Sequence, residues 1–163
     1  MDPDGAQIAK RDDTMVIREM PHEECIALLA RNRLARLACA SDGQPYIVPL
    51  NFAYDDGCIY AFSTIGRKVD WMRQNARVCV EVDEITSSEQ WASVIVLGRF
   101  KELVDIPELQ GARAHAYRVL NPYASWWAPA YLRLPGDREV RALDPVYFRI
   151  AIDDITGRRA ASA

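Results

Sequence analysis

The sequence contains few of the side chains that usually form metal centres. It has only two histidines, His22 and His115, and its four cysteines are separated by 14, 19 and 21 positions. Metal sites need closely spaced ligands such as a C-x-x-C pair, and no such pair occurs. We therefore predict no metal site and no metal cofactor. The cysteines are expected to be reduced and to lie in or near the core, as in a reducing compartment: Cys25, Cys39, Cys58 and Cys79.

The sequence also lacks long apolar runs and clusters of like charge. No segment approaches the about 18 apolar residues of a membrane-spanning helix, and the polar residues 1–13 do not resemble a signal peptide. The 20 basic residues are interspersed among 23 acidic ones, and a formal net charge of −3 does not suit the phosphate backbone of a nucleic acid. We expect a soluble, cytoplasmic protein without a membrane or nucleic-acid partner.

Several catalytic patterns are missing as well. The sequence has no P-loop, no nucleophile elbow and no supported pair of catalytic carboxylates, so we predict no catalytic residue. Its 163 residues, of which 50% are hydrophobic, are enough to fold without disulfide bonds. We expect a single domain over residues 1–163, with flexible ends at 1–15 and 158–163.

Hydrophobic periodicity divides the chain into strands and a few helices. A period near 3.6 predicts helices, and a period of two predicts strands. The predicted helices lie at 20–32, 66–75 and 107–120, and the predicted strands at 33–40, 45–54, 58–63, 77–83, 91–104 and 145–153. In the second helix Ile65, Val69 and Met72 form a narrow apolar stripe. Gly98, inside the longest strand, is expected to mark a bulge or bend.

The order of these elements predicts the fold class. The strands follow one another with short turns, as in an antiparallel meander, and the regular strand–helix alternation of parallel folds is not sustained. The length and expected curvature of residues 91–104 favour a barrel. We predict a mainly β (α+β) protein, in which six antiparallel strands form a closed or partly closed barrel covered by a few helices.

The segment from Phe62 to Trp71, F-S-T-I-G-R-K-V-D-W, suggests an anion site. Arg67 and Lys68 stand at the start of a predicted helix, where the helix dipole makes each cation unfavourable by about 0.3–1 kcal/mol. A bound phosphate would reverse this effect, because the first-turn amides, both cations and the hydroxyls of Ser63 and Thr64 would converge on it. The alternative is a plain helix cap made by Ser63 or Thr64, with both cations in solvent.

Pro49 suggests a second part of the same site. It lies within the strand at 45–54, on the face opposite the predicted core residues, and it has no amide hydrogen for a strand partner. Its backbone therefore lies at a sheet edge or faces something other than a strand. A planar ring against residues 48–51, joined by several carbons to a phosphate at residues 63–68, has the shape of flavin mononucleotide (FMN). An ordinary edge-strand proline is the alternative.

Four segments in order resemble a known family: P-Y-I-V-P-L-N-F, I-Y-A-F-S-T-I-G-R-K-V-D-W-M, R-V-C-V-E-V and W-A-S-V-I-V-L-G-R-F. They resemble the pyridoxamine 5'-phosphate oxidase-like flavoproteins of the FMN-binding split-barrel fold, and most of all the nitroimidazole-reductase-like branch. The resemblance extends over about residues 20–158. It implies a six-stranded split barrel, a homodimer and one FMN in each of two clefts between the subunits.

The resemblance also implies roles for particular residues. Trp91 matches a position that approaches the cofactor from the partner subunit, although it could equally be a core residue. Trp126 and Trp127 could cover the ring or form a substrate pocket, with dimer contact or core packing as alternatives. The residues implied to bind the cofactor are Val48, Pro49, Leu50, Asn51, Phe62, Ser63, Thr64, Arg67, Lys68 and Trp91.

The sequence departs from this family pattern at one position. Phe62 stands where the nitroimidazole-reductase-like branch often has histidine, so chemistry that needs an imidazole there is not expected. His22 and His115 are both expected to be surface or packing residues. We predict an FMN-dependent oxidoreductase acting on a small aromatic or heteroaromatic molecule. The alternatives are a flavin- or haem-binding protein without turnover, a reductase using the deazaflavin F420, and a true pyridoxamine 5'-phosphate oxidase.

Overall fold

Alternating apolar residues form an antiparallel sheet that closes on itself. The computed structural model describes residues 15–122, 131–132, 141–142 and 145–162. In this part of the chain seven strands share one sheet in the order β1-β9-β4-β3-β2-β5-β6, and β6 also pairs with β9. These strands are β1 (Met15–Glu19), β2 (Leu34–Ser41), β3 (Gln44–Asp55), β4 (Cys58–Ser63), β5 (Arg77–Ser87), β6 (Gln90–Glu102) and β9 (Val146–Ser162).

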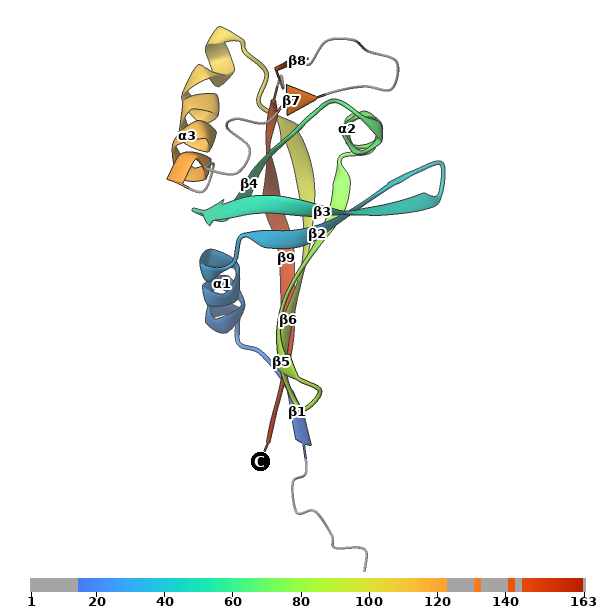
Figure 1. Ribbon diagram of the computed structural model, residues 1–163, viewed down its shortest axis with the longest axis vertical. Helices are drawn as coiled ribbons and strands as arrows, with labels where there is room; N and C mark the ends of the chain where they lie inside the picture. Colours follow the sequence, from blue (N-terminus) through green and yellow to red (C-terminus); the bar gives the residue numbers. More distant parts are fainter. Residues whose placement is uncertain (1–14, 123–130, 133–140, 143–144, 163) are drawn as a thin grey trace, which may run out of the picture.

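The pairing of β6 with β9 makes a ring of six strands, from β9 through β4, β3, β2, β5 and β6 back to β9. Every pairing in the ring is antiparallel. Figure 1 shows β5, β6 and β9 running down past β2 and β3 toward β1. A further small sheet pairs β7 (Tyr131–Leu132) with β8 (Arg141–Ala142). The predicted six-stranded barrel is confirmed, and its strands fit the split-barrel arrangement.

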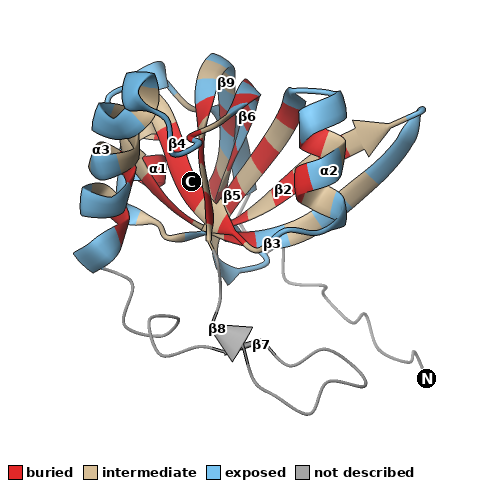
Figure 2. Ribbon diagram, turned by 90° about the horizontal axis from the view of Figure 1, so that it is seen from above, coloured by how far each residue is buried: buried red, intermediate tan, exposed pale blue. Residues whose placement is uncertain are grey.

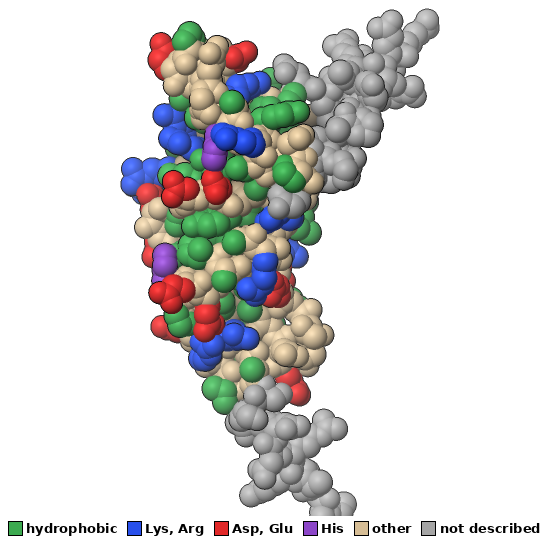
Figure 3. All heavy atoms as spheres, turned by 90° about the vertical axis from the view of Figure 1, so that its left-hand side faces the viewer, with side chains coloured by type: hydrophobic (Ala, Val, Ile, Leu, Met, Phe, Trp, Pro, Cys, Tyr) green, Lys and Arg blue, Asp and Glu red, His purple; other side chains and the backbone are tan. Residues whose placement is uncertain are grey.

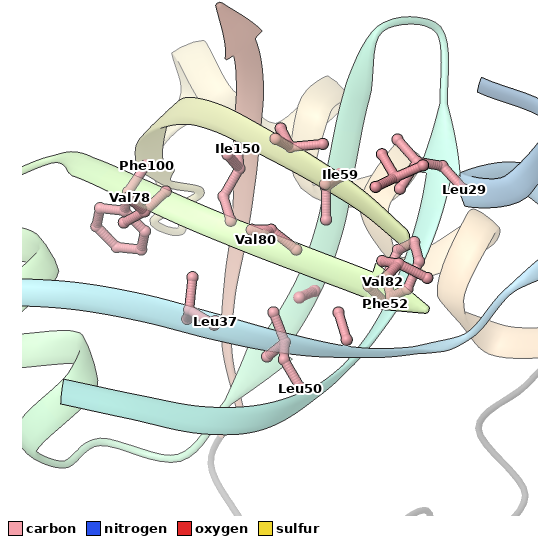
Figure 4. Packing of buried hydrophobic residues seen from close by; sticks show 14 of the residues in the cluster. Leu29, Leu37, Leu50, Phe52, Ile59, Val78, Val80, Val82, Phe100 and Ile150 are labelled. Atoms are coloured by element: carbon pink, nitrogen blue, oxygen red, sulfur yellow. The ribbon is translucent and has the colours of Figure 1, made fainter. Parts of the chain in front are cut away.

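The core lies inside this ring. Side chains from β2, β3, β5 and β9 point into the space between the strands, as Leu37, Leu50, Val80 and Ile150 show in Figure 4. All four of these residues are buried. Their burial follows the period of two, because alternate residues of a strand point to opposite faces. The predicted core face of residues 45–54 is confirmed at its centre, where Leu50 and Phe52 are buried.

Three helices and a short 3-10 helix η1 (Pro107–Leu109) occur in the described residues: α1 (His22–Arg31), α2 (Arg67–Gln74) and α3 (Gln110–Leu120). Each buries one side against the sheet, as the red segments of α2 and α3 indicate in Figure 2. The predicted stripe of α2 is confirmed for Val69 and Met72, which are buried, but Ile65 is 64% exposed. The helix begins only after Gly66, so Ile65 is not part of its repeat.

The two ends of the described chain differ most from the prediction. The final strand was expected to stop at residue 153 and residues 158–163 to be flexible, but β9 continues to Ser162. Residues 158–162 pair with β1, and residues 158–160 also pair with β6 on the other side. The polar composition of residues 158–163 suggested a flexible end. The strand is instead held by hydrogen bonds to segments that are distant in the sequence, and a local pattern does not reveal such partners.

Gly98 lies at a bulge, as predicted. Leu97 pairs with Asp154 and Gly98 with Ile152, so Asp153 is the extra residue, and the carboxylate of Asp153 accepts a hydrogen bond from Arg99 at 2.9 Å. A Cβ atom added to Gly98 would lie 2.5 Å from the carbonyl oxygen of Ala151. Glycine therefore permits β6 and β9 to approach closely enough to close the ring.

We expect Gly98→Ala to lower the free energy of unfolding by about 1–3 kcal/mol, because the added methyl group meets the backbone of Ala151 as well as the buried Ile150 side chain. Chemical denaturation measures this change, with one common value for the dependence of the free energy of unfolding on denaturant concentration. Gly111→Ala is the control, because a Cβ atom at Gly111 would meet nothing within 4 Å. Gly111 lies in α3, so this control should leave stability unchanged or raise it by up to about 1 kcal/mol. Equal stability of the two variants would contradict the assigned close approach.

Candidate functional site

The predicted phosphate site lies where β4 ends and α2 begins. β4 stops at Ser63, and Gly66 occupies the N-cap position of α2. The amides of Val69 and Asp70 donate to the carbonyl oxygen of Gly66 at 3.0 and 3.1 Å. Within the described residues no side chain caps this helix, so neither Ser63 nor Thr64 makes the plain cap that was the alternative interpretation. The first amides of α2 thus remain available to an anion.

Arg67 and Lys68 occupy the first turn of α2. The Arg67 guanidinium carbon lies 5.5 Å from the centre of the Tyr46 ring, and Tyr46 itself packs edge-on against Trp71 at 5.6 Å. Lys68 is half-buried, and burial lowers the pKa of its ammonium group, an effect that Cys39 partly opposes. No carboxylate in the described part of the chain forms an ion pair with either cation, whereas Asp70 pairs with Arg73 at 3.8 Å. An anion is the missing partner that would stabilise both.

The two hydroxyl residues contribute unequally. Ser63 is only 5% exposed, and its Oγ donates a hydrogen bond to the carbonyl oxygen of Thr64 at 2.9 Å. Its proton must turn away from this carbonyl before it can donate to a phosphate, since phosphate oxygens only accept. Thr64 is half-buried beside it. The geometry therefore suits Thr64, Arg67 and Lys68 as direct donors, with Ser63 available after a rotation of its hydroxyl.

The strand that carries Pro49 has an open edge. β3 pairs with β2 over residues 44–51, but it pairs with β4 only over residues 52–55. The amide of Phe52 donates a hydrogen bond to the carbonyl oxygen of Arg33 at 2.9 Å. Because backbone hydrogen bonds alternate along an antiparallel pair, this bond determines which residues of β3 are hydrogen-bonded to β2. By this register Val48 and Leu50 direct their backbone groups toward β2, and Ile47, Pro49 and Asn51 direct theirs away from it. Pro49 consequently removes no hydrogen bond from the ladder.

This open edge places Pro49 at the edge of the sheet, which fits both an ordinary edge-strand proline and a ligand beside the strand. Among the described residues, no strand lies beside residues 44–51 on the side away from β2. The Asn51 amide and the Pro49 carbonyl can thus face a ligand, and the exposed Pro49 and half-buried Asn51 leave room for one. Val48 and Leu50 point to the other face, where Leu50 is in the core, so their side chains cannot both lie against the same ring face as Pro49.

Phe62 and Trp91 lie apart from each other. Phe62 is half-buried near the end of β4, with its ring centre 6.1 Å from that of Tyr147. Trp91 begins β6 and pairs with Ile85 and Ala160, and it lines a groove of about 550 Å³ with Ile95 and other residues of β1, β6 and β9. Figure 1 places β1 and the free end of the long ladder far from α2. A single chain does not bring Trp91 to the phosphate site.

The remaining predicted residues are accounted for as follows. Trp126 and Trp127 lie outside the described residues. His22 is exposed. His115 Nε2 donates to the Asp55 carboxylate at 2.8 Å, its Nδ1 accepts from Arg118 at 3.4 Å, and its ring packs edge-on against Tyr60. Both ring nitrogens of His115 are therefore engaged. The four cysteines are free thiols, with Cys25 and Cys39 buried and the other two half-buried, as expected.

The described residues contain no group of three or more histidine, cysteine or acidic side chains arranged to hold a metal ion. None of the helices in the described segments is both long and apolar enough to span a membrane.

Sequence reasoning missed two features near the site. Tyr46 was assigned to the core face of its strand, but it also supports the Arg67 guanidinium. Tyr147 packs against Phe62, Tyr117 and Arg113, although only its strand was predicted. Arg113 and Tyr117 are four residues apart in a predicted helix, so their position on one face was visible in the sequence. Their proximity to Tyr147 was not, because it depends on how α3 docks on the sheet.

The fold and this site together define a class. A ring of six antiparallel strands, with an uncapped, cation-bearing helix beside the open edge of a strand, is the arrangement of a split barrel. The family profile described as pyridoxamine 5'-phosphate oxidase matches residues 21–159. The chain therefore belongs to the pyridoxamine 5'-phosphate oxidase-like family, as its motifs indicated.

Individual relatives agree with this assignment. An uncharacterised protein of Rhizobium meliloti is 41% identical over 152 residues, which cover 91% of this chain and 98% of that protein. The crystal structure of a FAD-binding protein of Mesorhizobium loti is 43% identical with a TM-score of 0.73, covering 91% of this chain and 99% of that one. A candidate 5-nitroimidazole antibiotic resistance protein of Bacteroides thetaiotaomicron shares the fold, with 16% identity, a TM-score of 0.65 and coverage of 91% and 90%.

Proposed function

We propose that this protein is an FMN-dependent oxidoreductase that acts on a small aromatic or heteroaromatic molecule. The observation that carries the proposal is the pair Arg67 and Lys68, which lacks a carboxylate partner in the described residues and stands at an uncapped helix start. The open edge of β3 lies within the same barrel and offers the Asn51 amide and the Pro49 carbonyl. The family assignment and the FAD-binding relative support a flavin as the ligand.

The residues present fit the two ends of a flavin mononucleotide. Its terminal phosphate would lie at the start of α2, where Arg67, Lys68, Thr64 and the first amides donate to it. Hydrogen bonds to a charged group are each worth about 1.5–3 kcal/mol, which explains how so few residues could hold the cofactor. Its ring system would lie along the open edge of β3, with the aromatic side chain of Phe62 nearby.

FMN is favoured over FAD for a specific reason. Arg67 and Lys68 are adjacent, and no carboxylate of the described residues pairs with either of them, so two cations meet at one point, as a single terminal phosphate requires. FAD has a diphosphate that joins its two halves, and it would also need a place for the adenosine. The Mesorhizobium loti relative is described as FAD-binding, so the cofactor released from this protein must be identified and not assumed.

Haem is less well supported. An axial histidine must present a free ring nitrogen to the iron. His115 has both nitrogens engaged by Asp55 and Arg118, and His22 is exposed on α1. The deazaflavin F420 would need further cations for its acidic tail. A true pyridoxamine 5'-phosphate oxidase would need a second phosphate site for its substrate, which was not found in the sequence.

We further propose that the protein is a homodimer in which the outward face of β6 meets a second copy. Ile95 and Leu97 are 36% and 49% exposed on this face, and Ile85, paired with Trp91, is 70% exposed. The acidic groups beside them have polar partners within the chain, because Arg36 forms ion pairs with Asp83 and Glu81, and Ser93 donates a hydrogen bond to Glu81. An apolar face with internally paired charges is suited to burial. In such a dimer Trp91 would reach the cofactor of the partner subunit.

When bound, a flavin supplies two-electron transfer between a donor and an acceptor. The chain's own residues then have three tasks. Arg67 and Lys68 hold the phosphate, the β3 edge orients the ring, and Phe62 limits access of water to one side of it. No acid or base is assigned to the reaction.

The proposal is tested with the purified, full-length protein. We expect yellow protein with the absorption spectrum of an oxidised flavin, one flavin per chain, and FMN as the compound released on denaturation, identified by mass. Anaerobic addition of NADH or NADPH should bleach the spectrum, and a nitroaromatic acceptor should restore it. A haem spectrum would overturn the proposed cofactor. Bound FMN that no nicotinamide donor or other reductant can cycle with an acceptor would support a binding protein without turnover.

A further inference from the structure

A second pocket lies beside α3. It has a volume of about 420 Å³ and is lined by Asp105, Gln110, Arg113, Ala114, Tyr117 and Tyr147. It is separate from both the start of α2 and the groove beside Trp91, with which it shares no residue. A volume of this order accommodates a molecule of one or two rings. Neither the cofactor nor the dimer proposal uses it.

The aromatic lining of this pocket continues toward the proposed flavin. Phe62 and Tyr147 pair directly across β4 and β9, and their ring centres are 6.1 Å apart. Tyr117 lies edge-on to Tyr147 at 6.4 Å. These three rings form a row from the residue expected near the cofactor ring into the pocket. A planar molecule can pack against such a row by stacking or edge-to-face contact.

Arg113 gives the pocket a fixed positive charge. Its guanidinium carbon lies 5.0 Å from the centre of the Tyr147 ring, and Nη1 donates to the carbonyl oxygen of Leu103 at 2.9 Å. These two contacts hold the guanidinium plane before any ligand arrives. In the described part of the chain no carboxylate forms an ion pair with Arg113, although Asp105 lines the same pocket. A half-buried guanidinium interacts more strongly with an anion than one in bulk water.

The other polar groups of the pocket are suited to the substituents of a ring. Burial, and secondarily Tyr117, raises the pKa of the Tyr147 phenol, so this group stays a neutral donor at ordinary pH. The Gln110 amide can donate or accept, and the Asp105 carboxylate can accept from an amine or hydroxyl. On the face that carries α1 and α3, basic and acidic side chains are interspersed, so the surface as a whole does not attract anions (Figure 3). The selectivity must come from Arg113.

We propose that the pocket between α3 and Tyr147 binds planar aromatic carboxylates and places their rings beside Phe62, with Arg113 binding the carboxylate. As a substrate site this rests on the proposed flavin function; as a binding site it does not. The guanidinium matches a carboxylate in two-point geometry, while Tyr147 and Tyr117 contact the ring. The expected substrates are therefore aromatic or heteroaromatic acids, in preference to their neutral amides.

Binding is tested with 4-nitrobenzoate and with its neutral analogue 4-nitrobenzamide, by calorimetry on the full chain with and without flavin. We expect 4-nitrobenzoate to bind at least tenfold more tightly than the amide. Arg113→Gln should remove this preference, weakening the acid tenfold or more while changing the amide less than twofold. Arg118→Gln is the matched control, because Arg118 lies on the same helix but faces His115 and not the pocket. The affinity of Arg113→Lys for 4-nitrobenzoate should lie between that of Arg113→Gln and that of the parent protein.

The outcomes separate this proposal from the cofactor proposal. Arg113→Gln should retain the flavin content and thermal midpoint of the parent protein, so a change in acid binding cannot come from loss of cofactor or fold. Equal binding of both probes, or an unchanged preference in Arg113→Gln, would overturn the pocket assignment even in a flavin-loaded protein. Displacement of 4-nitrobenzoate by lower concentrations of adenosine monophosphate would also overturn it, since the pocket would then suit the adenosine of FAD.

Discussion

Replacement of both Arg67 and Lys68 by alanine is expected to abolish retention of flavin while leaving the barrel folded. Two charge-assisted hydrogen bonds of about 1.5–3 kcal/mol each would be lost, so affinity should fall at least about a hundredfold. Flavin per chain after gel filtration and the dissociation constant of added FMN measure the effect. The fold should survive, because neither side chain is in the core and the removal of two cations from a helix N-terminus favours the helix.

The control for this experiment removes two other cations. Arg77 and Lys101 are exposed, and within the described residues neither forms an ion pair. Arg77→Ala with Lys101→Ala therefore makes the same change in net charge away from α2, and it should leave flavin content within experimental error of the parent protein. Normal flavin content in the Arg67 and Lys68 double variant would remove the basis of the phosphate site. Equal loss in both double variants would point to a general charge effect instead.

Introducing two aspartates on the outward face of β6, as Ile95→Asp with Leu97→Asp, is expected to convert the proposed dimer into a monomer. Both side chains are exposed in the single chain, so the monomer should stay folded, although the new carboxylates would lie opposite Glu81 and Asp154 and lower its stability. In the dimer the two carboxylates would be buried without partners, which is strongly unfavourable. Light scattering measures the mass, and the same fractions should show loss of bound flavin, because Trp91 of one chain would no longer meet the site of the other.

A matched control introduces the same charge elsewhere. Val104 and Ile106 are 39% and 42% exposed, close to the values for Ile95 and Leu97, but they follow the end of β6 and are not on its outward face. Val104→Asp with Ile106→Asp should remain dimeric. A parent protein that is already monomeric, or a dimer that tolerates the substitutions in β6, would exclude this face as the contact between copies. Flavin that stays bound to a proven monomer would exclude only the proposed contribution of Trp91 to the cofactor site of the partner subunit.

The parts of the fold that the sequence predicted well depend on local physics. Strand residues alternate between core and solvent, which revealed β2, β3 and β4 within a few residues, and turn residues marked the hairpins between them. Gly98 could be identified because glycine inside a long strand has few other uses. The start of α2 could be located because cations at a helix N-terminus oppose the helix dipole, a conflict visible in ten residues of sequence.

The parts that the sequence did not predict depend on contacts between distant segments. Residues 15–19 and 158–162 pair with each other although neither has a strong apolar alternation. The support of Arg67 by Tyr46, and the joining of Phe62, Tyr147, Tyr117 and Arg113, each involve residues from separate elements. Composition restricts which side chains can meet, but the docking of α3 decides which of them do.

By itself, then, the sequence determined the antiparallel class, the order of the strands along the chain and the position of Arg67 and Lys68 at the start of a helix, because each of these follows from periodicity or from charge within a short segment. Only the tertiary structure decided that β6 closes on β9, that the edge of β3 beside Pro49 stays without a strand, and that a second pocket forms under α3. The reason is that ring closure and helix docking bring together groups up to about a hundred residues apart, whose separate patterns carry no information about their distance.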